Sequence, residues 1–194
     1  MFKNILQNKW DDLAPPVQKH YGLCDGEEIV MKGKLSVRHG KFIKLLMPFI
    51  RLTGALVPVE GDGFSVTVSN KRMGHCYYWN RRFEKDGKAY VFKSEMIENC
   101  GTVVEFVGLG IGIRMGLKVI DKKLVFEDKG YVIKIGSKLI PIPLNLLMGK
   151  AMIEEFEEFG ESKDVGMKFI VTHPWFGFAF SYMGYFNIVS SDKD

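Results

Sequence analysis

The feature that most constrains the fold is a series of segments in which apolar and polar residues alternate, separated by tight-turn residues. Residues 75–97, HCYYWNRRFEKDGKAYVFKSEMI, have the pattern of a β-hairpin with Asp86-Gly87 at its turn. FSVTV alternates before it at 64–68. TVVEFVGLGIGIRMGLKVI follows at 102–120, with glycines that indicate a bulge, sharp curvature or close approach of another backbone. Consecutive hairpins predict an antiparallel sheet rather than βαβ units.

Further strands are expected on both sides of this region. Residues 28–37 form one strand, and 165–172 and 177–189 form a closing hairpin. The stretch after residue 120 is predicted to be two short strands around a turn at Asp128-Lys129-Gly130. A sheet of about eight or nine strands usually curls into a barrel or half-barrel.

Three segments have helical spacing. The N-terminal segment 4–21 is expected to form short helical pieces divided by Pro15 and Pro16. KFIKLLMPFIRL at 41–52 predicts a basic helix with a broad apolar face, and LNLLMGKAMIEEFEEF at 144–159 predicts a helix with an acidic solvated side. The fold class is therefore α+β and mainly β: a curved antiparallel meander forming a barrel or half-barrel, calycin-like or helix-grip-like, with two or three helices.

Composition narrows the class of protein. The chain of 194 residues has no repeat or linker, so we expect one domain over 1–194. The net charge is +4, but the basic residues mostly alternate with apolar ones, so nucleic-acid binding is not expected. The three cysteines have no paired spacing, which disfavours a disulfide framework and a metal site. The N-terminus has no signal-peptide pattern and no segment has the length of a transmembrane helix, so a cytoplasmic location is predicted.

Polar side chains fall on strand faces that are otherwise apolar, because alternation assigns successive side chains to opposite faces. The rows that contain them are Tyr77, Trp79, Arg81 and Phe83; Val103, Glu105 and Val107; Met167, Phe169, Val171 and His173; and Phe178, Phe180, Tyr182 and Phe186. Burying an unpaired charge costs more free energy than a marginally stable domain has available. We therefore expect the inward polar groups to bind one another.

Arg81 and Glu105 are the obvious ion pair, because the planar guanidinium matches a carboxylate. His173 and Tyr182 are predicted to complete a hydrogen-bonded network with that pair. Two interpretations remain open: a structural ion pair with a core histidine, or the polar floor of an apolar pocket lined also by Trp79.

Signatures of conventional catalysis are absent from the sequence. It has no GxSxG, P-loop or HExxH motif, and its four histidines lack ligand spacing. GLGIGIRMG lies within the meander and opens no helix, so it does not indicate a dinucleotide loop. No cofactor and no metal site are predicted, and the sequence leaves open whether the chain is an enzyme while favouring a binding domain.

Several motifs together resemble a bacterial family, domain of unknown function 4166. They are RLTGALVP, YWNRRF, VVEFVGLG, the IPIPL stretch and HPWFGFAFSYMGYF, and the resemblance spans about residues 13–188. Residues at the pattern positions are Trp79, Arg81, Phe83, Glu105, Pro141, Pro143, His173, Pro174, Gly177, Tyr182 and Gly184. Met183 stands where the last motif often carries an arginine, so no role of that arginine transfers.

The resemblance implies no assigned activity. In similar proteins the domain is joined to a saccharopine-dehydrogenase-like reductase module, which implies a reductase as a partner. Three functions therefore remain in view. The first is a binding or accessory domain for a lipid-like or otherwise hydrophobic small molecule. The second is an isomerase- or hydrolase-type enzyme using His173 with Tyr182 or Glu105 as acid–base groups, which requires His173 to reach a cavity. The third is association with a membrane surface through the basic helix 41–52.

Overall fold

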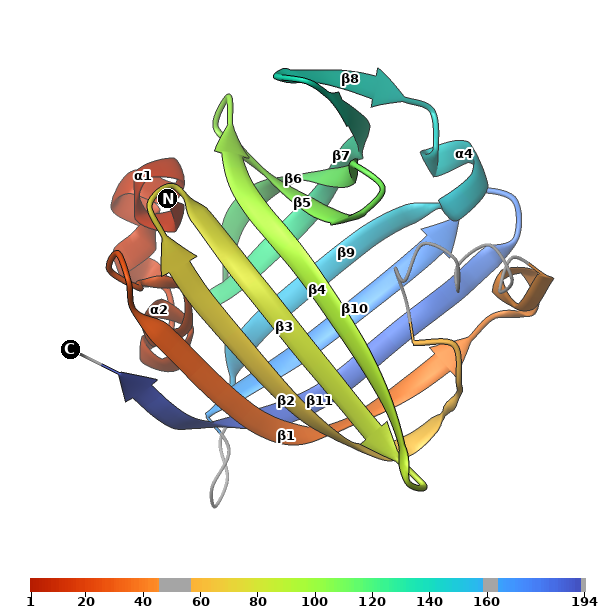
Figure 1. Cartoon of the computed structure of the whole chain (residues 1–194), viewed down its shortest axis with the longest axis horizontal. Helices are drawn as coiled ribbons and strands as arrows, with labels where there is room; N and C mark the ends of the chain where they lie inside the picture. Colours follow the sequence, from red (N-terminus) through yellow and green to blue (C-terminus); the bar gives the residue numbers. More distant parts are fainter. Residues whose placement is uncertain (46–56, 159–163, 193–194) are drawn as a thin grey trace.

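Ten antiparallel strands close into a barrel in the computed structural model, which describes residues 1–45, 57–158 and 164–192 (Figure 1). The strands are β1 Glu28–His39, β2 Gly61–Met73, β3 Cys76–Lys85, β4 Lys88–Asn99, β5 Thr102–Gly108, β6 Ile111–Ile120, β7 Lys123–Ile135, β8 Lys138–Ile142, β9 Lys150–Glu157, β10 Val165–His173 and β11 Gly177–Asp192. Their order is β6-β5-β4-β3-β2-β1-β11-β10-β9-β7, and the β6–β7 pairing closes the ring. β8 pairs with β7 outside the ring. The predicted mainly-β antiparallel barrel is confirmed.

Local backbone geometry explains two features of the ring. Asp86 and Gly87 both have positive φ, 50° and 71°, as a two-residue hairpin turn requires, so the predicted β3–β4 hairpin is confirmed. At the β1–β11 contact, a Cβ on Gly184 would lie 2.4 Å from the Cβ of Leu35. Only glycine therefore allows these two strands to approach as they do.

The N-terminal segment forms the predicted short helical pieces at one end of the barrel (Figure 1). They are α1 Phe2–Leu6, the 3-10 helix η1 Gln7–Asp12 and α2 Pro15–Tyr21, which Gly22 ends. The ring of Phe2 packs inside the barrel, 5.2 Å from Tyr77 and 6.2 Å from Phe126 between centroids. We call this part of the interior, covered by residues 1–23, the closed end. No helix in the described ranges is long and apolar enough to cross a membrane.

The helix predicted over 144–159 is wrong. Only α4, Asn145–Met148, is helical, and the chain continues as strand β9 between β7 and β10. Gly149 ends α4 with φ of 85°, and a Cβ there would lie 2.7 Å from the carbonyl oxygen of Thr172. Residues 151, 153 and 155 point inward, with the period of two that a strand has. The apolar residues of this segment also fit the helical period, and that fit led to the wrong prediction.

Two other expectations about local structure need revision. The turn predicted at Asp128-Lys129-Gly130 is wrong, because β7 runs through it with a register shift against β6, and the turn to β8 comes at Gly136. For the helix predicted over 41–52, residues 41–45 are helical and the rest lies outside the described residues. Register shifts in both pairings of β6 agree with the bulges that the glycines of 102–120 indicate.

Candidate functional site

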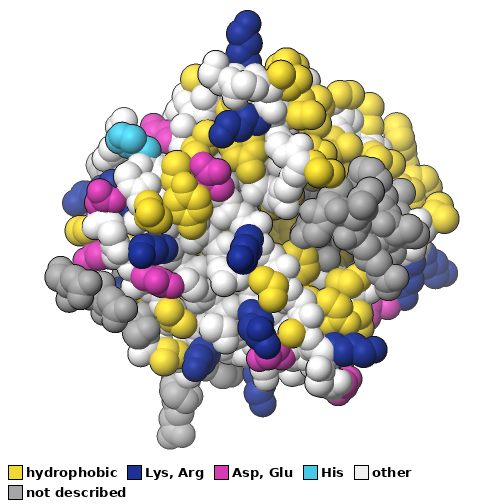
Figure 2. All heavy atoms as spheres, viewed as in Figure 1, with side chains coloured by type: hydrophobic (Ala, Val, Ile, Leu, Met, Phe, Trp, Pro, Cys, Tyr) yellow, Lys and Arg dark blue, Asp and Glu magenta, His cyan; other side chains and the backbone are white. Residues whose placement is uncertain are grey.

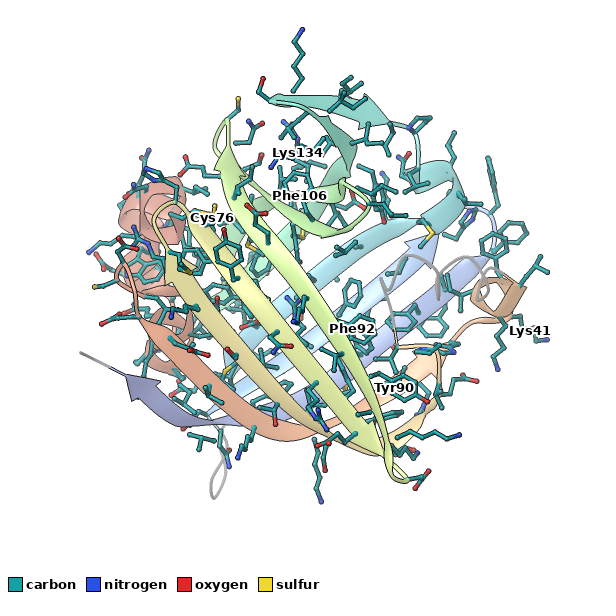
Figure 3. The ribbon with its side chains drawn as sticks, in the orientation of Figure 1. Lys41, Cys76, Tyr90, Phe92, Phe106 and Lys134 are labelled. Atoms are coloured by element: carbon teal, nitrogen blue, oxygen red, sulfur yellow. The ribbon has the colours of Figure 1, made fainter. Side chains whose placement is uncertain are left out.

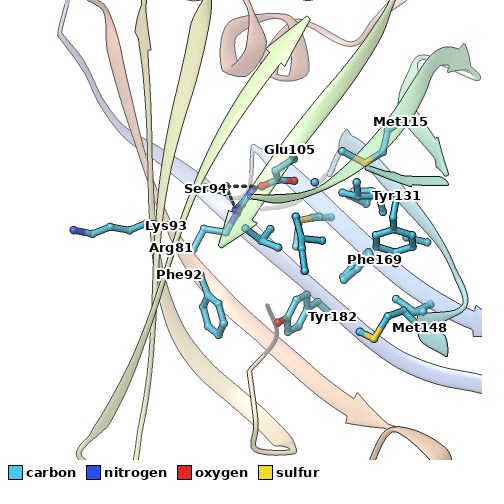
Figure 4. A pocket seen from close by; sticks show the side chains of 18 of the residues that line it. Arg81, Phe92, Lys93, Ser94, Glu105, Met115, Tyr131, Met148, Phe169 and Tyr182 are labelled. Carbon is cyan, nitrogen blue, oxygen red and sulfur yellow. Dashed lines mark hydrogen bonds and ion pairs between the residues drawn. The ribbon is translucent and has the colours of Figure 1, made fainter. Parts of the chain in front are cut away.

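The interior of the barrel contains two adjoining chambers. The outer chamber has a volume of about 180 Å³ and lies toward the end that carries α4 and helix residues 41–45 (Figures 1 and 4). The inner chamber, of about 60 Å³, lies toward the closed end. The walls of the outer chamber are largely apolar and include Phe92, Val107, Ile113, Met115, Met148, Ala151, Phe169 and Tyr182. Side chains common to both chambers are Arg81, Phe83, Glu105, Ile153 and Met167.

Arg81, Ser94 and Glu105 form a closed polar triangle between the chambers (Figure 4). Arg81 Nη2 lies 2.9 Å from Glu105 Oε1, and its Nη1 donates to Ser94 Oγ at 2.9 Å. Ser94 Oγ in turn donates to Glu105 Oε1 at 2.6 Å. The predicted ion pair is confirmed, and Ser94 is a third member that the sequence interpretation missed.

The strand ladder explains why this triangle borders open space. β4 pairs with β5 only over Glu95–Asn99, so its first half, Lys88–Ser94, pairs with β3 alone among the described strands. Phe92 and Ser94 project from that half toward the outer chamber. The guanidinium of Arg81 lies 4.6 Å from the ring centroid of Trp79, so the triangle also makes a cation–π contact on the side of the inner chamber.

Tyr182 lines the outer chamber but bonds elsewhere than predicted. Its hydroxyl oxygen accepts a hydrogen bond from the Val57 backbone N–H at 2.9 Å. Its ring lies against Phe83 and Phe169, each 5.6 Å away between centroids. Desolvation by burial raises the pKa of Tyr182 well above its usual range, against the lowering effect of the Val57 bond. The hydroxyl therefore stays protonated and fixes the wall of the chamber.

His173 is buried at the rim and lines neither chamber. Nδ1 accepts from the Trp175 backbone N–H at 3.2 Å, so Nε2 carries the hydrogen that bonds the Leu146 carbonyl oxygen at 3.0 Å. The prediction that His173 joins Arg81, Glu105 and Tyr182 in one network is therefore wrong, because both ring nitrogens are occupied by backbone groups. His173 therefore lies away from both chambers, and backbone groups hold its ring.

A bulge accounts for one further error of face assignment. The β10–β11 register shifts between Val171 and Thr172, so Val171 pairs with Phe180 and Thr172 with Phe178. Ala179 is consequently buried while Phe178 is exposed, although alternation placed Phe178 inward with Tyr182. The inward rows on β3 and β5 are confirmed, and so is the row on β10 as far as Val171.

A second polar cluster in the inner chamber was missed by the sequence interpretation. His20 Nδ1 lies 2.9 Å from Glu155 Oε2, and the Tyr21 hydroxyl donates to Glu155 Oε1 at 2.6 Å. All three side chains are buried and line the chamber together with Trp79. The sequence did carry one signal: alternation along Ala151, Ile153 and Glu155 would have placed that carboxyl inward had the segment been assigned as a strand.

The described residues contain no group of three or more His, Cys, Asp or Glu side chains arranged to hold a metal ion. The fold and site together define a closed antiparallel barrel with a partly apolar interior cavity and two buried polar clusters. The chain belongs to the family described as Domain of unknown function (DUF4166), whose model matches residues 13–186. No curated protein matches the chain.

Proposed function

We propose that the barrel binds a small, largely apolar molecule in the outer chamber, with the Arg81–Ser94–Glu105 triangle as its polar floor. The observation that supports this is the chamber itself: about 180 Å³ of space behind mostly apolar walls. An engineered apolar cavity of about 150 Å³ in another protein binds benzene, so a volume of this size accepts a single ring. Transfer of such a ligand from water gains about 25 cal/mol for each Å² of apolar surface buried.

The polar floor gives the ligand an orientation. An arginine carries five N–H donors, more than the contacts of Arg81 with Ser94 and Glu105 use. The Arg81 side chain is 25% exposed, whereas that of Glu105 is 9% exposed, so the guanidinium is the more accessible member of the pair. A few polar groups in an otherwise apolar cavity are the usual arrangement of a small-molecule site.

The test is a binding titration with para-fluoroethylbenzene, an apolar single-ring probe, followed by fluorine NMR. Ala151→Phe places a ring in the outer chamber, so it should weaken binding by tenfold or more. Met152→Phe is the matched control, because Met152 is the next residue on β9 and is exposed. Equal binding by the wild type and Ala151→Phe would show that the probe does not occupy this chamber.

Docking on a lipid surface is a second candidate, favoured by exposed apolar side chains at the end of the barrel that carries α4. Trp175 is 71% exposed, Leu45 77% and Leu146 55%. The rings of Phe42 and Phe176 stack at 4.2 Å, which joins helix residues 41–45 to the β10–β11 turn. Clustered apolar side chains at one surface commonly mark an interaction site.

Vesicles containing phosphatidylserine test this second candidate by co-sedimentation. Lys41 is exposed, while Lys44 binds Glu60 at 2.6 Å, so Lys41→Glu is the cleaner charge reversal and Lys44→Glu the weaker comparison. Trp175→Ser should reduce vesicle binding, and binding should fall as salt rises. Failure to sediment with vesicles at low salt would exclude the candidate without affecting the cavity proposal.

A further inference from the structure

Two side chains that line the inner chamber each have a buried nitrogen without a hydrogen-bond partner among the described residues. These nitrogens are His20 Nε2 and Trp79 Nε1. The two side chains are 1% and 4% exposed, both line the inner chamber, and their rings meet edge to face at 5.1 Å between centroids. Buried polar groups are nearly always hydrogen-bonded, so two such atoms on one small cavity point to a bound polar group.

The partners of His20 determine what its free nitrogen offers. Desolvation by burial, reinforced by the nearby Glu155 charge, raises the pKa of Tyr21 well above its usual range, so Tyr21 donates to Glu155 as a neutral hydroxyl. A carboxylate only accepts hydrogen bonds, so Nδ1 of His20 donates to the other Glu155 oxygen. In a neutral imidazole whose Nδ1 carries the hydrogen, Nε2 offers a lone pair. Trp79 Nε1 is a donor only.

A group that satisfies both nitrogens must therefore donate one hydrogen bond and accept another. A hydroxyl group does both: its O–H donates to His20 Nε2, and its oxygen accepts from Trp79 Nε1. A methyl ether only accepts, and a hydrocarbon does neither. A carboxylate would be unfavourable because Glu105 and Glu155 already line the same chamber, and Arg81 is paired with Glu105.

The two chambers adjoin in a way that allows one molecule to occupy both. Arg81, Phe83, Glu105, Ile153 and Met167 line both volumes. The inner chamber, about 60 Å³, accommodates a small polar group but not a second ring. We infer that the inner chamber is a hydroxyl subsite, so that the ligand class of this barrel is a neutral hydroxylated apolar molecule whose body lies in the outer chamber. This inference rests on the binding function proposed above.

Three probes of nearly equal size test the inference: para-fluorophenethyl alcohol, its methyl ether and para-fluoroethylbenzene. The alcohol should bind the wild-type protein about three- to tenfold more tightly than either analogue, the factor expected for one or two neutral hydrogen bonds. The indole N–H signals of a nitrogen–proton correlation spectrum give a direct reading, because the chain has only three tryptophans. The alcohol should shift the Trp79 signal, and para-fluoroethylbenzene should leave it nearly unchanged.

Two substitutions test the contributions of His20 Nε2 and Trp79 Nε1 separately. His20→Asn keeps an N–H group near Glu155 in place of Nδ1 and removes Nε2, and Trp79→Phe keeps an aromatic ring and removes Nε1. Each should lower alcohol affinity toward that of the ether without changing the affinity of para-fluoroethylbenzene. Trp175→Phe is the matched control for the loss of an indole, because Trp175 is 71% exposed at the rim. Thermal melting of each variant checks that it is folded, and the indole signal of the wild type needs no variant at all.

The outcomes distinguish failure of the subsite from failure of the cavity. If all three probes bind with equal affinity and the Trp79 signal does not move, the hydroxyl subsite is excluded and the outer-chamber function stands. If no probe binds, and Ala151→Phe therefore has nothing to weaken, the proposed function itself fails. Selective binding of the alcohol that survives both His20→Asn and Trp79→Phe would place its hydroxyl elsewhere and would also overturn the subsite.

Discussion

The two ends of the barrel interior are built from similar strands but filled differently. At the closed end, α1, η1 and α2 contribute apolar side chains that pack between aromatic rings from β3 and β7. At the other end, Met148 of α4 and Ile43 of helix residues 41–45 line the outer chamber of about 180 Å³. The space-filling view shows charged side chains dispersed over the face it presents and hydrophobic side chains gathered on its right, toward the end that carries α4 (Figure 2).

The two buried polar clusters differ in the elements that supply the partners of their carboxyl groups. At the closed end Glu155 is held by His20 and Tyr21, which come from the N-terminal helix α2. Toward the hollow end Glu105 is held by Arg81 and Ser94, which come from the neighbouring strands β3 and β4 (Figure 4). Phe92 lies on β4 with Ser94 (Figure 3). The first cluster joins the cover to the barrel, and the second stays at the border of open space.

The largest expected effect comes from truncating a ring at each end. Phe2→Ala removes a fully buried ring that lies 4.4 Å from Tyr21 and 5.2 Å from Tyr77, so it should lower the free energy of unfolding by about 3–5 kcal/mol. Phe92→Ala removes a partly buried ring that faces the outer chamber, and should cost about 1–2 kcal/mol because it leaves less new cavity. Urea unfolding measures both. Equal costs would mean that the two ends are equally well packed.

The next largest effect is expected from breaking the Arg81–Glu105 ion pair. Glu105→Leu leaves the Arg81 guanidinium without its carboxylate and should cost about 2–3 kcal/mol, less than the loss of a partner in a fully buried pair because Arg81 is 25% exposed. The double variant Arg81→Met with Glu105→Leu removes the charge as well, so its stability should return to within about 1 kcal/mol of the wild type. A double-mutant cycle measured by urea unfolding gives the coupling. A double variant less stable than Glu105→Leu alone would show that Arg81 has another essential partner.

Alternation predicts which side chains face the interior only where a strand pairs without a register shift. Arg81 was placed correctly because β3 pairs with β2 and β4 without a register shift, so alternation holds from Tyr77 to Phe83. Phe178 was placed wrongly because a bulge on β11 reverses the alternation, and nothing in its own sequence marks that position. His173 is buried as expected, but it lies at the rim, and its partners Leu146 in α4 and Trp175 in the β10–β11 turn are positioned only in the folded chain.

The inner cluster was unpredictable for a different reason. Over a short apolar segment, helical and strand periods both match, so LNLLMGKAMIEEFEEF was consistent with a helix that exposes its glutamates. In the fold β9 lies between β7 and β10, and that non-local pairing overrides the local preference. Glu155 is buried as a consequence, and His20 and Tyr21 meet it from more than a hundred residues away in the chain.

The smallest expected effect comes from making the same substitution at both ends of the barrel. It is the sharpest test of whether the two ends are packed differently. Ala14 at the closed end is 2% exposed, and Ala151 on the wall of the outer chamber is 6% exposed, so burial alone predicts the same response to a larger side chain. Ala14→Leu should cost about 1–3 kcal/mol, since a filled core must shift to accept new methyl groups. Ala151→Leu should change the free energy of unfolding by less than about 1 kcal/mol, because its added atoms enter existing space and gain apolar contacts there. If urea unfolding gives the two variants the same cost, the outer chamber does not accept added volume, and a ligand of similar bulk would not enter it either.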